Sequence, residues 1–370
     1  MAEVFSCDRL AELQCSGVPD TSDDVGARAR ARSSLVASSN IFGVLIAASG
    51  DRLLAWWVAD VERQAHAAKA RSDALGDERR QQGDTRAVRA KDLGLPPLEP
   101  HQTLQLSGLI SGLALSADQR SIALFADGAL HVYELAALMG GAQQPCGATS
   151  RHALACGAVT HVSWCSTAPG VIAAVTDASR VVVLDASTGA TLTERDGVLS
   201  AHWHPAQSWL AIGRADGHIT ILKIREGVVA NEVSLPAPPA DVDGFSVHFL
   251  SWIEPSAIAA SYRLVEEDGE DGEDQTVDFI VWQAEGDDLT EGAPVGHPLC
   301  DEVIPFSPPP PGVHHRFHAQ YIGEWKVLVL ACGVSKDIKL VYFDAEDREW
   351  RIYEGELAWR DARLVRRGLV

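Results

Sequence analysis

Short apolar segments separated by turn signals recur along most of this chain, and residues 198–224 show the pattern most clearly. The pattern predicts strands over residues 200–203, 209–212 and 218–224, joined by a His-Pro turn and by a tight turn at Asp216-Gly217. The third strand is apolar on both faces, so both faces of its sheet should be covered. Stacked four-stranded sheets in a β-propeller meet that requirement, and we interpret these residues as one blade.

The same unit recurs five more times, over residues 33–58, 108–135, 160–186, 247–284 and 315–345. Its third strands superpose at Val132, Val183, Ile221, Ile280 and Leu340. The interval from Val183 to Ile221 is close to the about 40 residues of a WD40-type repeat. Three units place a tryptophan at a strand end, where a large ring can fill the gap between adjacent sheets: Trp164, Trp203 and Trp252. The sequence therefore predicts six consecutive blades.

The remaining segments define the expected domain boundaries. Residues 1–32 form an N-terminal strand and loop, residues 33–345 form blades one to six, and residues 346–370 begin a seventh blade or form a C-terminal tail. Residues 60–92 are rich in Ala, Arg, Gln and Glu, which predicts one or two exposed helices inserted between blades. The fold class is all-β, a WD40-like β-propeller of seven-bladed design whose seventh blade is largely missing or incomplete in this chain.

Closure of the ring has two possible solutions, because a propeller left open exposes a sheet edge. Residues 5–15 could complete the last sheet together with the tail, or the rest of the seventh blade could be absent from this chain. We favour the second solution, in which residues 350–353 are the opening strand of that blade.

The chain carries a formal net charge of −20, from 51 acidic and 31 basic residues. Direct binding to nucleic acid needs concentrated positive charge, so we expect none. The negative charge can attract a basic protein, or it can serve only to keep a large scaffold soluble. No apolar run approaches the about 20 residues of a membrane span, so we expect no membrane insertion. The seven cysteines show no CxxC spacing and indicate reduced thiols in a cytosolic or nuclear protein.

An acidic loop within the fifth unit is the densest charge feature of the sequence. Its carboxylates include Glu266, Glu267, Asp268, Glu270 and Asp271, between two predicted strands. The loop could steer a basic partner, or it could be a solvated insertion of like charges. Such a loop cannot hold the geometry that general acid–base catalysis needs.

The sequence contains no set of residues typical of a catalytic or metal-binding site. His202 and His204 could ligate a metal, but a structural role fits the turn position of His204 better, and the group His314, His315 and His318 has no Cys or second acidic ligand beside it. Residues near the expected axis are small and neutral: Ser111, Thr160, Ser200 and Ser246. We therefore expect no enzyme activity, no cofactor and no metal.

Four segments together resemble a known family: residues 32–56, 160–186, 199–224 and 314–350. The least generic is the last, which contains Tyr321-Ile322-Gly323-Glu324-Trp325. They are similar to the N-terminal propeller of the cytoplasmic-filament nucleoporin CAN. Members of that family continue into a coiled coil and a Phe-Gly-repeat tail, whereas Phe42-Gly43 is the only such dipeptide here. The chain is thus a fragment, a truncated gene model or a divergent relative.

The resemblance implies a nuclear pore docking module at the cytoplasmic face, in contact with other nucleoporins. It implies that the propeller binds the basic surface of the N-terminal RecA-like lobe of a DEAD-box RNA helicase in mRNA export. The family's contact stretch aligns with residues 360–365, where Arg360 would pair with a carboxylate and Leu364 and Val365 would be apolar anchors. The alternatives are a generic WD40 scaffold of another complex and, less favoured, a propeller enzyme.

Overall fold

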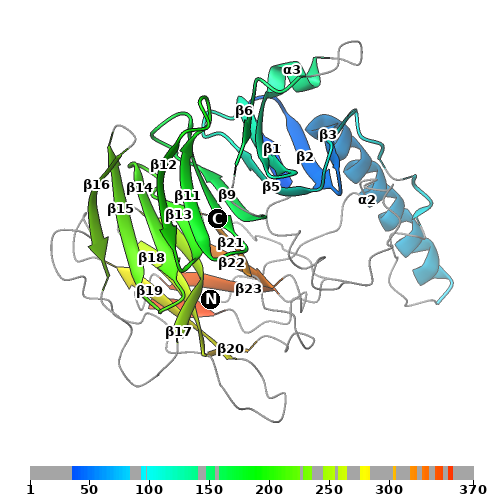
Figure 1. Ribbon diagram of the computed structural model, residues 1–370. Helices are drawn as coiled ribbons and strands as arrows, with labels where there is room; N and C mark the ends of the chain where they lie inside the picture. The colour runs from blue at the N-terminus through cyan, green and yellow to red at the C-terminus, as the bar shows by residue number, and fades with distance from the viewer. Residues whose placement is uncertain are drawn as a thin grey trace, which may run out of the picture.

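The computed structural model contains six antiparallel sheets, each built from four strands that follow one another in the chain (Figure 1). The structure describes residues 36–83, 93–96, 98–140, 147–154, 158–225, 228–235, 245–254, 257–264, 276–283, 303–305, 317–322, 327–332, 338–344 and 349–352.

The first three sheets contain β1 (Val36–Ser39), β2 (Val44–Ser49), β3 (Arg52–Trp57) and β4 (Gln102–Gln105); β5 (Ile110–Leu115), β6 (Ser121–Ala126), β7 (Ala129–Glu134) and β8 (Ser150–Ala153); and β9 (Val159–Trp164), β10 (Val171–Thr176), β11 (Arg180–Asp185) and β12 (Thr191–Asp196). The other three contain β13 (Val198–Trp203), β14 (Trp209–Arg214), β15 (Ile219–Arg225) and β16 (Val228–Ser234); β17 (Phe245–Glu254), β18 (Ala257–Leu264), β19 (Thr276–Gln283) and β20 (Val303–Pro305); and β21 (Phe317–Ile322), β22 (Val327–Cys332), β23 (Ile338–Asp344) and β24 (Glu349–Ile352).

The first strands of successive sheets lie beside one another. β1 contacts β5, β5 contacts β9, β9 contacts β13, β13 contacts β17 and β17 contacts β21. A series of sheets that meet along their first strands is the arrangement of propeller blades around an axis. The prediction of a WD40-like β-propeller is therefore confirmed at the level of a mostly-β propeller of four-stranded sheets.

The predicted superposition of the third strands is reflected in the pairing registers at four of its five positions, whereas the fifth, Leu340, lies opposite Val329. Val132, Val183, Ile221 and Ile280 each lie opposite an alanine of the second strand: Ala123, Ala173, Ala211 and Ala260. All four alanines are buried, because the small side chain lets the neighbouring sheet approach closely. The repeat is thus preserved to the level of single residue pairs in the second to fifth sheets.

The core consists of apolar layers between adjacent sheets, and β15 shows why both of its faces are apolar. Ile219 and Ile221 pack with Val247 of the fifth sheet, whereas Leu222 and Ile224 pack with residues of the third sheet such as Val183. The expectation from the sequence that this strand is covered on both sides is confirmed.

Tryptophan side chains link successive sheets through hydrogen bonds. The Trp164 Nε1–H donates to the Ala114 carbonyl of the second sheet at 3.0 Å, and the Trp203 Nε1–H donates to the Ser163 carbonyl of the third at 3.2 Å. Each indole ends the first strand of its own sheet and reaches the first strand of the sheet before. The predicted gap-filling role is confirmed, and the indoles also satisfy backbone carbonyls between blades.

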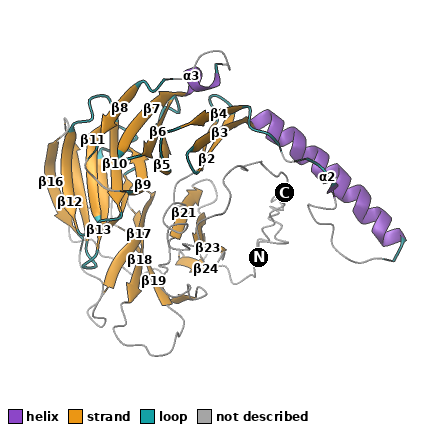
Figure 2. Cartoon of the chain, turned by 45° about the vertical axis from the view of Figure 1, so that its right-hand side comes forward, coloured by secondary structure: helices purple, strands orange, loops and turns teal. Residues whose placement is uncertain are grey.

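Helix α2 (Val58–Gln81) projects away from the sheets in both views (Figures 1 and 2). The sequence placed the helical insertion between two blades, and this position is wrong: α2 connects β3 to β4, inside the first sheet. The chain returns to the outer edge of the sheet it left, because β4 pairs with β3. Near its start α2 packs Val61 against Trp56 and Leu98, and Gln64 donates a hydrogen bond to the Pro96 carbonyl.

The predicted opening strand of a seventh blade is also placed differently. β24 pairs antiparallel with β23, with Phe343 opposite Trp350 and Val341 opposite Ile352. These residues therefore form the outer strand of the sixth sheet and do not begin another one. Residues 5–15, the other candidate for closing the ring, lie outside the described residues.

No helix in the described part of the chain is long and apolar enough to cross a membrane.

Candidate functional site

Strand direction divides the turns between two opposite faces of the stacked sheets. In a four-stranded antiparallel sheet, the turn between strands two and three leaves at one end, and the other two turns leave at the opposite end. We call the face with the β2–β3, β6–β7, β10–β11 and β14–β15 turns the Asp-turn face. The opposite face carries the β1–β2, β5–β6, β9–β10 and β13–β14 turns, and we call it the pocket face.

Each of the four described turns of the Asp-turn face contains one aspartate: Asp51, Asp127, Asp177 and Asp216. Residues 50–51, 127–128, 177–179 and 215–218 include no lysine or arginine. The turn geometry favours this residue type, since Asp127 has φ 52° and Gly128 has φ 66°, a conformation that aspartate and glycine tolerate. In the described turns of the pocket face, Asp118 and Arg120 are the charged side chains and they cancel. The four described turns of the Asp-turn face therefore contain acidic residues and no basic ones, whereas the acidic and basic residues of the four named pocket-face turns are equal in number.

Arg52, Arg180 and Arg214 flank three of these turns, and acidic side chains engage Arg180 and Arg214. Arg180 binds Asp196 at 2.7 Å and Glu194 at 3.7 Å, and Arg214 binds Asp216 at 3.1 Å. Desolvation opposes ionisation of Asp216, but hydrogen bonds from the His218 N–H and the Arg214 side chain outweigh it and lower the pKa of the carboxyl. Asp216 is therefore ionised at neutral pH.

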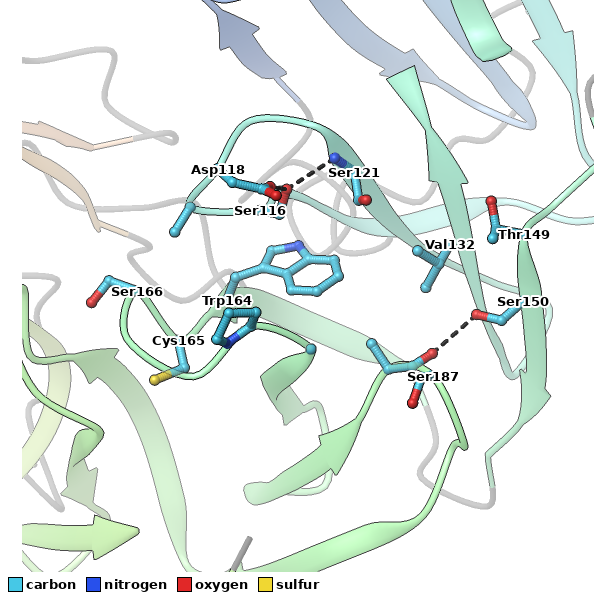
Figure 3. A pocket seen from close by; sticks show the side chains of 14 residues that line it. Ser116, Asp118, Ser121, Val132, Thr149, Ser150, Trp164, Cys165, Ser166 and Ser187 are labelled. Atoms are coloured by element: carbon cyan, nitrogen blue, oxygen red, sulfur yellow. Dashed lines mark hydrogen bonds between the residues drawn. The ribbon is translucent and has the colours of Figure 1, made fainter. Parts of the chain in front are cut away.

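A cavity of about 370 Å³ opens on the pocket face between the second and third sheets (Figure 3). Ser116, Asp118 and Ser121 lie on the side of the second sheet, and Trp164 and Cys165 on the side of the third. Pattern reasoning along the sequence missed this cavity, because two sheets distant in the chain form it together.

The two candidate metal-binding histidines have structural contacts. The His204 Nδ1 accepts the Ala206 N–H at 3.0 Å, and its ring lies edge-on to Trp252 at 4.5 Å. The His202 Nδ1 accepts the Trp252 N–H at 3.3 Å, which joins the fourth and fifth sheets. In the described part of the chain, no group of three or more His, Cys, Asp or Glu residues is arranged to hold a metal ion. The structural interpretation of His204 agrees with these contacts.

His202 makes stability depend on pH. Desolvation lowers its pKa to about 4, below the ordinary value of about 6.5 that the unfolded chain retains. Between these values the unfolded state binds more protons, so stability is fully present above about pH 6.5 and is lost as the pH falls towards 4, by at most about 1.4 kcal/mol per pH unit. Urea unfolding at several pH values tests this. His202→Asn keeps an acceptor for Trp252 and should remove this part of the slope; an unchanged slope would contradict the assignment.

The hydroxyl groups near the expected axis bond to backbone carbonyls. Ser111 donates to Phe125 at 3.3 Å, Thr160 to Val175 at 3.1 Å and Ser200 to Val247 at 2.9 Å. These bonds fix the first strands of sheets two to four, so the hydroxyls serve the architecture.

The predicted partner-binding residues cannot be placed. Arg360, Leu364 and Val365 lie outside the described residues, and so do Glu266, Glu267, Asp268, Glu270 and Asp271. The sequence did reveal the Asp-Gly turns at residues 127–128 and 216–217, but as turn signals alone. The sequence alone does not give the direction of the strands, and strand direction determines that these carboxylates lie on one face.

Two solved structures are similar to the chain along most of its length. The N-terminal domain of Nup159 shares 12% identity, covers 98% of this chain and 88% of that chain, and has a TM-score of 0.55. The Nup159 complex with S. cerevisiae Dbp5, Gle1, IP6 and ADP shows 14% identity, 98% and 87% coverage and a TM-score of 0.54. At these identities the likeness shows the fold. No curated protein sequence matches the chain.

A family profile described as NUP159/214 beta propeller matches residues 85–341, more than half of the chain. This match confirms the resemblance noted in the sequence. It also agrees with the expectation that the protein is not an enzyme, since the propellers of this nucleoporin family are non-enzymatic scaffolds of the nuclear pore complex. The chain therefore belongs to the NUP159/214 β-propeller family.

Proposed function

We propose that this chain is a docking module of the nuclear pore complex that binds a DEAD-box RNA helicase through its Asp-turn face. The observation that carries the proposal is the placement of Asp51, Asp127, Asp177 and Asp216 on one face, with no lysine or arginine in the same turns. A row of carboxylates can occupy the basic surface of a helicase lobe as phosphates do, and can speed the encounter of the two proteins.

Similarity to a helicase-binding propeller supports this assignment. Nup159, to which the chain is similar along 98% of its length, has been solved with Dbp5 bound. By this analogy the partner is the basic surface of the N-terminal RecA-like lobe, the process is mRNA export, and the place is the cytoplasmic face of the pore.

The residues singled out in the sequence extend the proposal. The acidic loop that contains Glu266, Glu267, Asp268, Glu270 and Asp271 connects β18 to β19, the pair equivalent to β14 and β15. We propose that this connection acts together with the four aspartate turns. Arg360, Leu364 and Val365 remain the proposed second contact, and the seven-bladed design and the boundaries at residues 32, 345 and 346 remain part of the same proposal.

Removing charge from the Asp-turn face should weaken helicase binding about tenfold. The double variant Asp127→Asn, Asp177→Lys changes two exposed side chains, and asparagine tolerates the positive φ at position 127. Each exposed charge contributes about 0.2–1 kcal/mol, and the change removes two negative charges and adds one positive charge. Binding to the purified N-terminal helicase lobe is measured by titration at about 50 mM and about 500 mM salt, where screening differs several-fold.

The matched control makes the same charge change on helix α2. Glu62→Gln with Asp73→Lys alters two exposed acidic residues away from the turns and should leave the affinity almost unchanged. The parent chain should bind at low salt and release at high salt. If both double variants weakened binding equally, the effect would come from the net charge of the chain and not from the Asp-turn face. Absence of binding at low salt would contradict the proposed function.

A further inference from the structure

The cavity on the pocket face exists because two adjacent turns are not joined. Between the first and second sheets, the Gln119 Oε1 accepts the Asn40 N–H at 2.8 Å. Between the third and fourth sheets, the Ser166 hydroxyl donates to the Pro205 carbonyl at 2.9 Å. Between the second and third sheets, the Trp164 indole donates to the Ala114 carbonyl of β5, and the Ser150 hydroxyl donates to the Ala186 carbonyl at 3.0 Å farther out. The cavity lies beside these two links.

The cavity has one wall on each sheet. Ser116 follows β5, Ser121 begins β6, Val132 lies within β7 and Thr149 precedes β8, so this wall crosses the second sheet from its inner to its outer edge. The opposite wall is the Trp164 indole with the β9–β10 and β11–β12 turns. Figure 3 shows the indole between the two groups of residues. The result is a narrow slot with an aromatic surface in it.

The polar groups of the slot are those that an extended peptide backbone can use. The hydroxyls of Ser121 and Thr149 have no hydrogen-bond partner among the described residues, whereas the Ser116, Ser150 and Ser187 hydroxyls are engaged. Both free hydroxyls lie on the wall of the second sheet, and each can donate to a carbonyl or accept an amide N–H.

The charge of the Asp118 side chain determines which ligands the slot can bind. Asp118 is the one charged residue among the described lining residues. Its Oδ1 accepts hydrogen bonds from the Ser116 hydroxyl at 2.6 Å and the Arg120 N–H at 3.1 Å. These bonds, the one from Ser116 first, lower the pKa of the Asp118 carboxyl, so it is ionised at neutral pH. Arg120 balances Asp118 in the turn as a whole but is not among the residues that line the slot, so the Asp118 carboxylate is the charge that a ligand in the slot meets. It favours a lysine or arginine over a phosphate or an acidic side chain.

We propose that this slot is a second docking site, which takes a linear segment of another protein with an aromatic side chain next to a lysine or arginine. The aromatic ring lies against Trp164, the cationic group reaches Asp118, and the peptide backbone bonds to Ser121 and Thr149. A volume of about 370 Å³ suits one or two residues, since pockets for larger ligands reach about 1,000 Å³. The site is on the face opposite the aspartate turns and is independent of helicase docking.

Selection of phage-displayed twelve-residue peptides on the immobilised chain tests the proposal. We expect enrichment of peptides with an aromatic residue within two positions of lysine or arginine. The enriched peptide, labelled with a fluorophore, is then titrated against variants by polarisation. Replacing its aromatic residue by alanine should weaken binding at least about tenfold, as expected when a buried aromatic side chain is lost.

Two exposed alanines give a matched pair of variants. Ala117→Trp places an indole at the slot and should weaken the peptide at least about tenfold, whereas Ala206→Trp lies in the equivalent turn of the fourth sheet and should have no effect. Asp118→Asn keeps the turn acceptor and should weaken the cationic peptide about two- to fivefold. Thr149→Trp, at the outer end of the slot, is the second blocking variant if Ala117→Trp does not fold.

Several results would overturn the proposal. These are no enrichment, enrichment of acidic peptides, or equal binding to the Ala117→Trp and Ala206→Trp variants. Helicase binding should be the same in the parent chain and the Ala117→Trp variant, so a failure of the peptide site and a failure of helicase docking are distinguishable.

Discussion

Replacing Trp203 by alanine is expected to lower the free energy of unfolding by about 3–5 kcal/mol, the usual cost of removing a large aromatic side chain from a core. Trp203 is 4% exposed and packs in the layer between the third and fourth sheets with Val183, Leu210 and Leu222. Its loss removes this contact area and leaves the Ser163 carbonyl without the indole donor. Urea unfolding followed by tryptophan fluorescence and circular dichroism measures the change.

Trp203→Phe separates the two contributions. Phenylalanine keeps most of the buried ring and loses the hydrogen bond to Ser163, so its cost should be about 1–2 kcal/mol. If Trp203→Ala were as stable as the parent chain, the indole would not be part of a packed layer and the stacked arrangement of the sheets would be contradicted.

Replacing Gly213 by valine is expected to cost about 3 kcal/mol, the upper end of the usual cost of overpacking. Gly213 lies on β14, and a Cβ there would lie 2.5 Å from Val247 Cγ1 of the fifth sheet and would also collide with the Ser200 Oγ. Neither neighbour can move away, because Val247 is buried and the Ser200 hydroxyl bonds to the Val247 carbonyl. Denaturant unfolding at equilibrium gives the effect.

Gly147→Val is the control for this substitution. No atom lies within 4 Å of a Cβ built on Gly147, and the residue is exposed, so the same change should cost less than about 0.5 kcal/mol. Similar effects of both substitutions would mean that the fourth and fifth sheets are not in close contact at Gly213.

Strands two and three of the second, third and fourth sheets could be predicted from the sequence because neighbouring sheets cover both of their faces. Their apolar runs and Asp-Gly turns are strong local signals. The outer strands β12 and β16 carried no such signal, since none of their side chains is buried. The same weakness explains the error at β24, where an outer strand was taken for the start of a new blade.

The two faces of the molecule could be predicted only in part. The sequence contains the aspartates and the turns, but it does not say which turns share a face until the order of strands in each sheet is known. The position of α2 depended on that order too, because nothing local shows that residues 102–105 pair with β3. The slot at Trp164 depends on the absence of a contact between two turns, and no residue pattern signals that absence.

Hydrogen exchange of the chain, alone and bound to the N-terminal helicase lobe, tests helicase docking through the Asp-turn face most directly. Backbone amides compared at the two sets of turns report which face is covered. We predict slower exchange on binding at residues 127–128, 177–179 and 215–218, and no change at residues 165–170 and 204–208. Slower exchange confined to residues 165–170 and 204–208, or no change at either set in a saturated complex, would contradict the account.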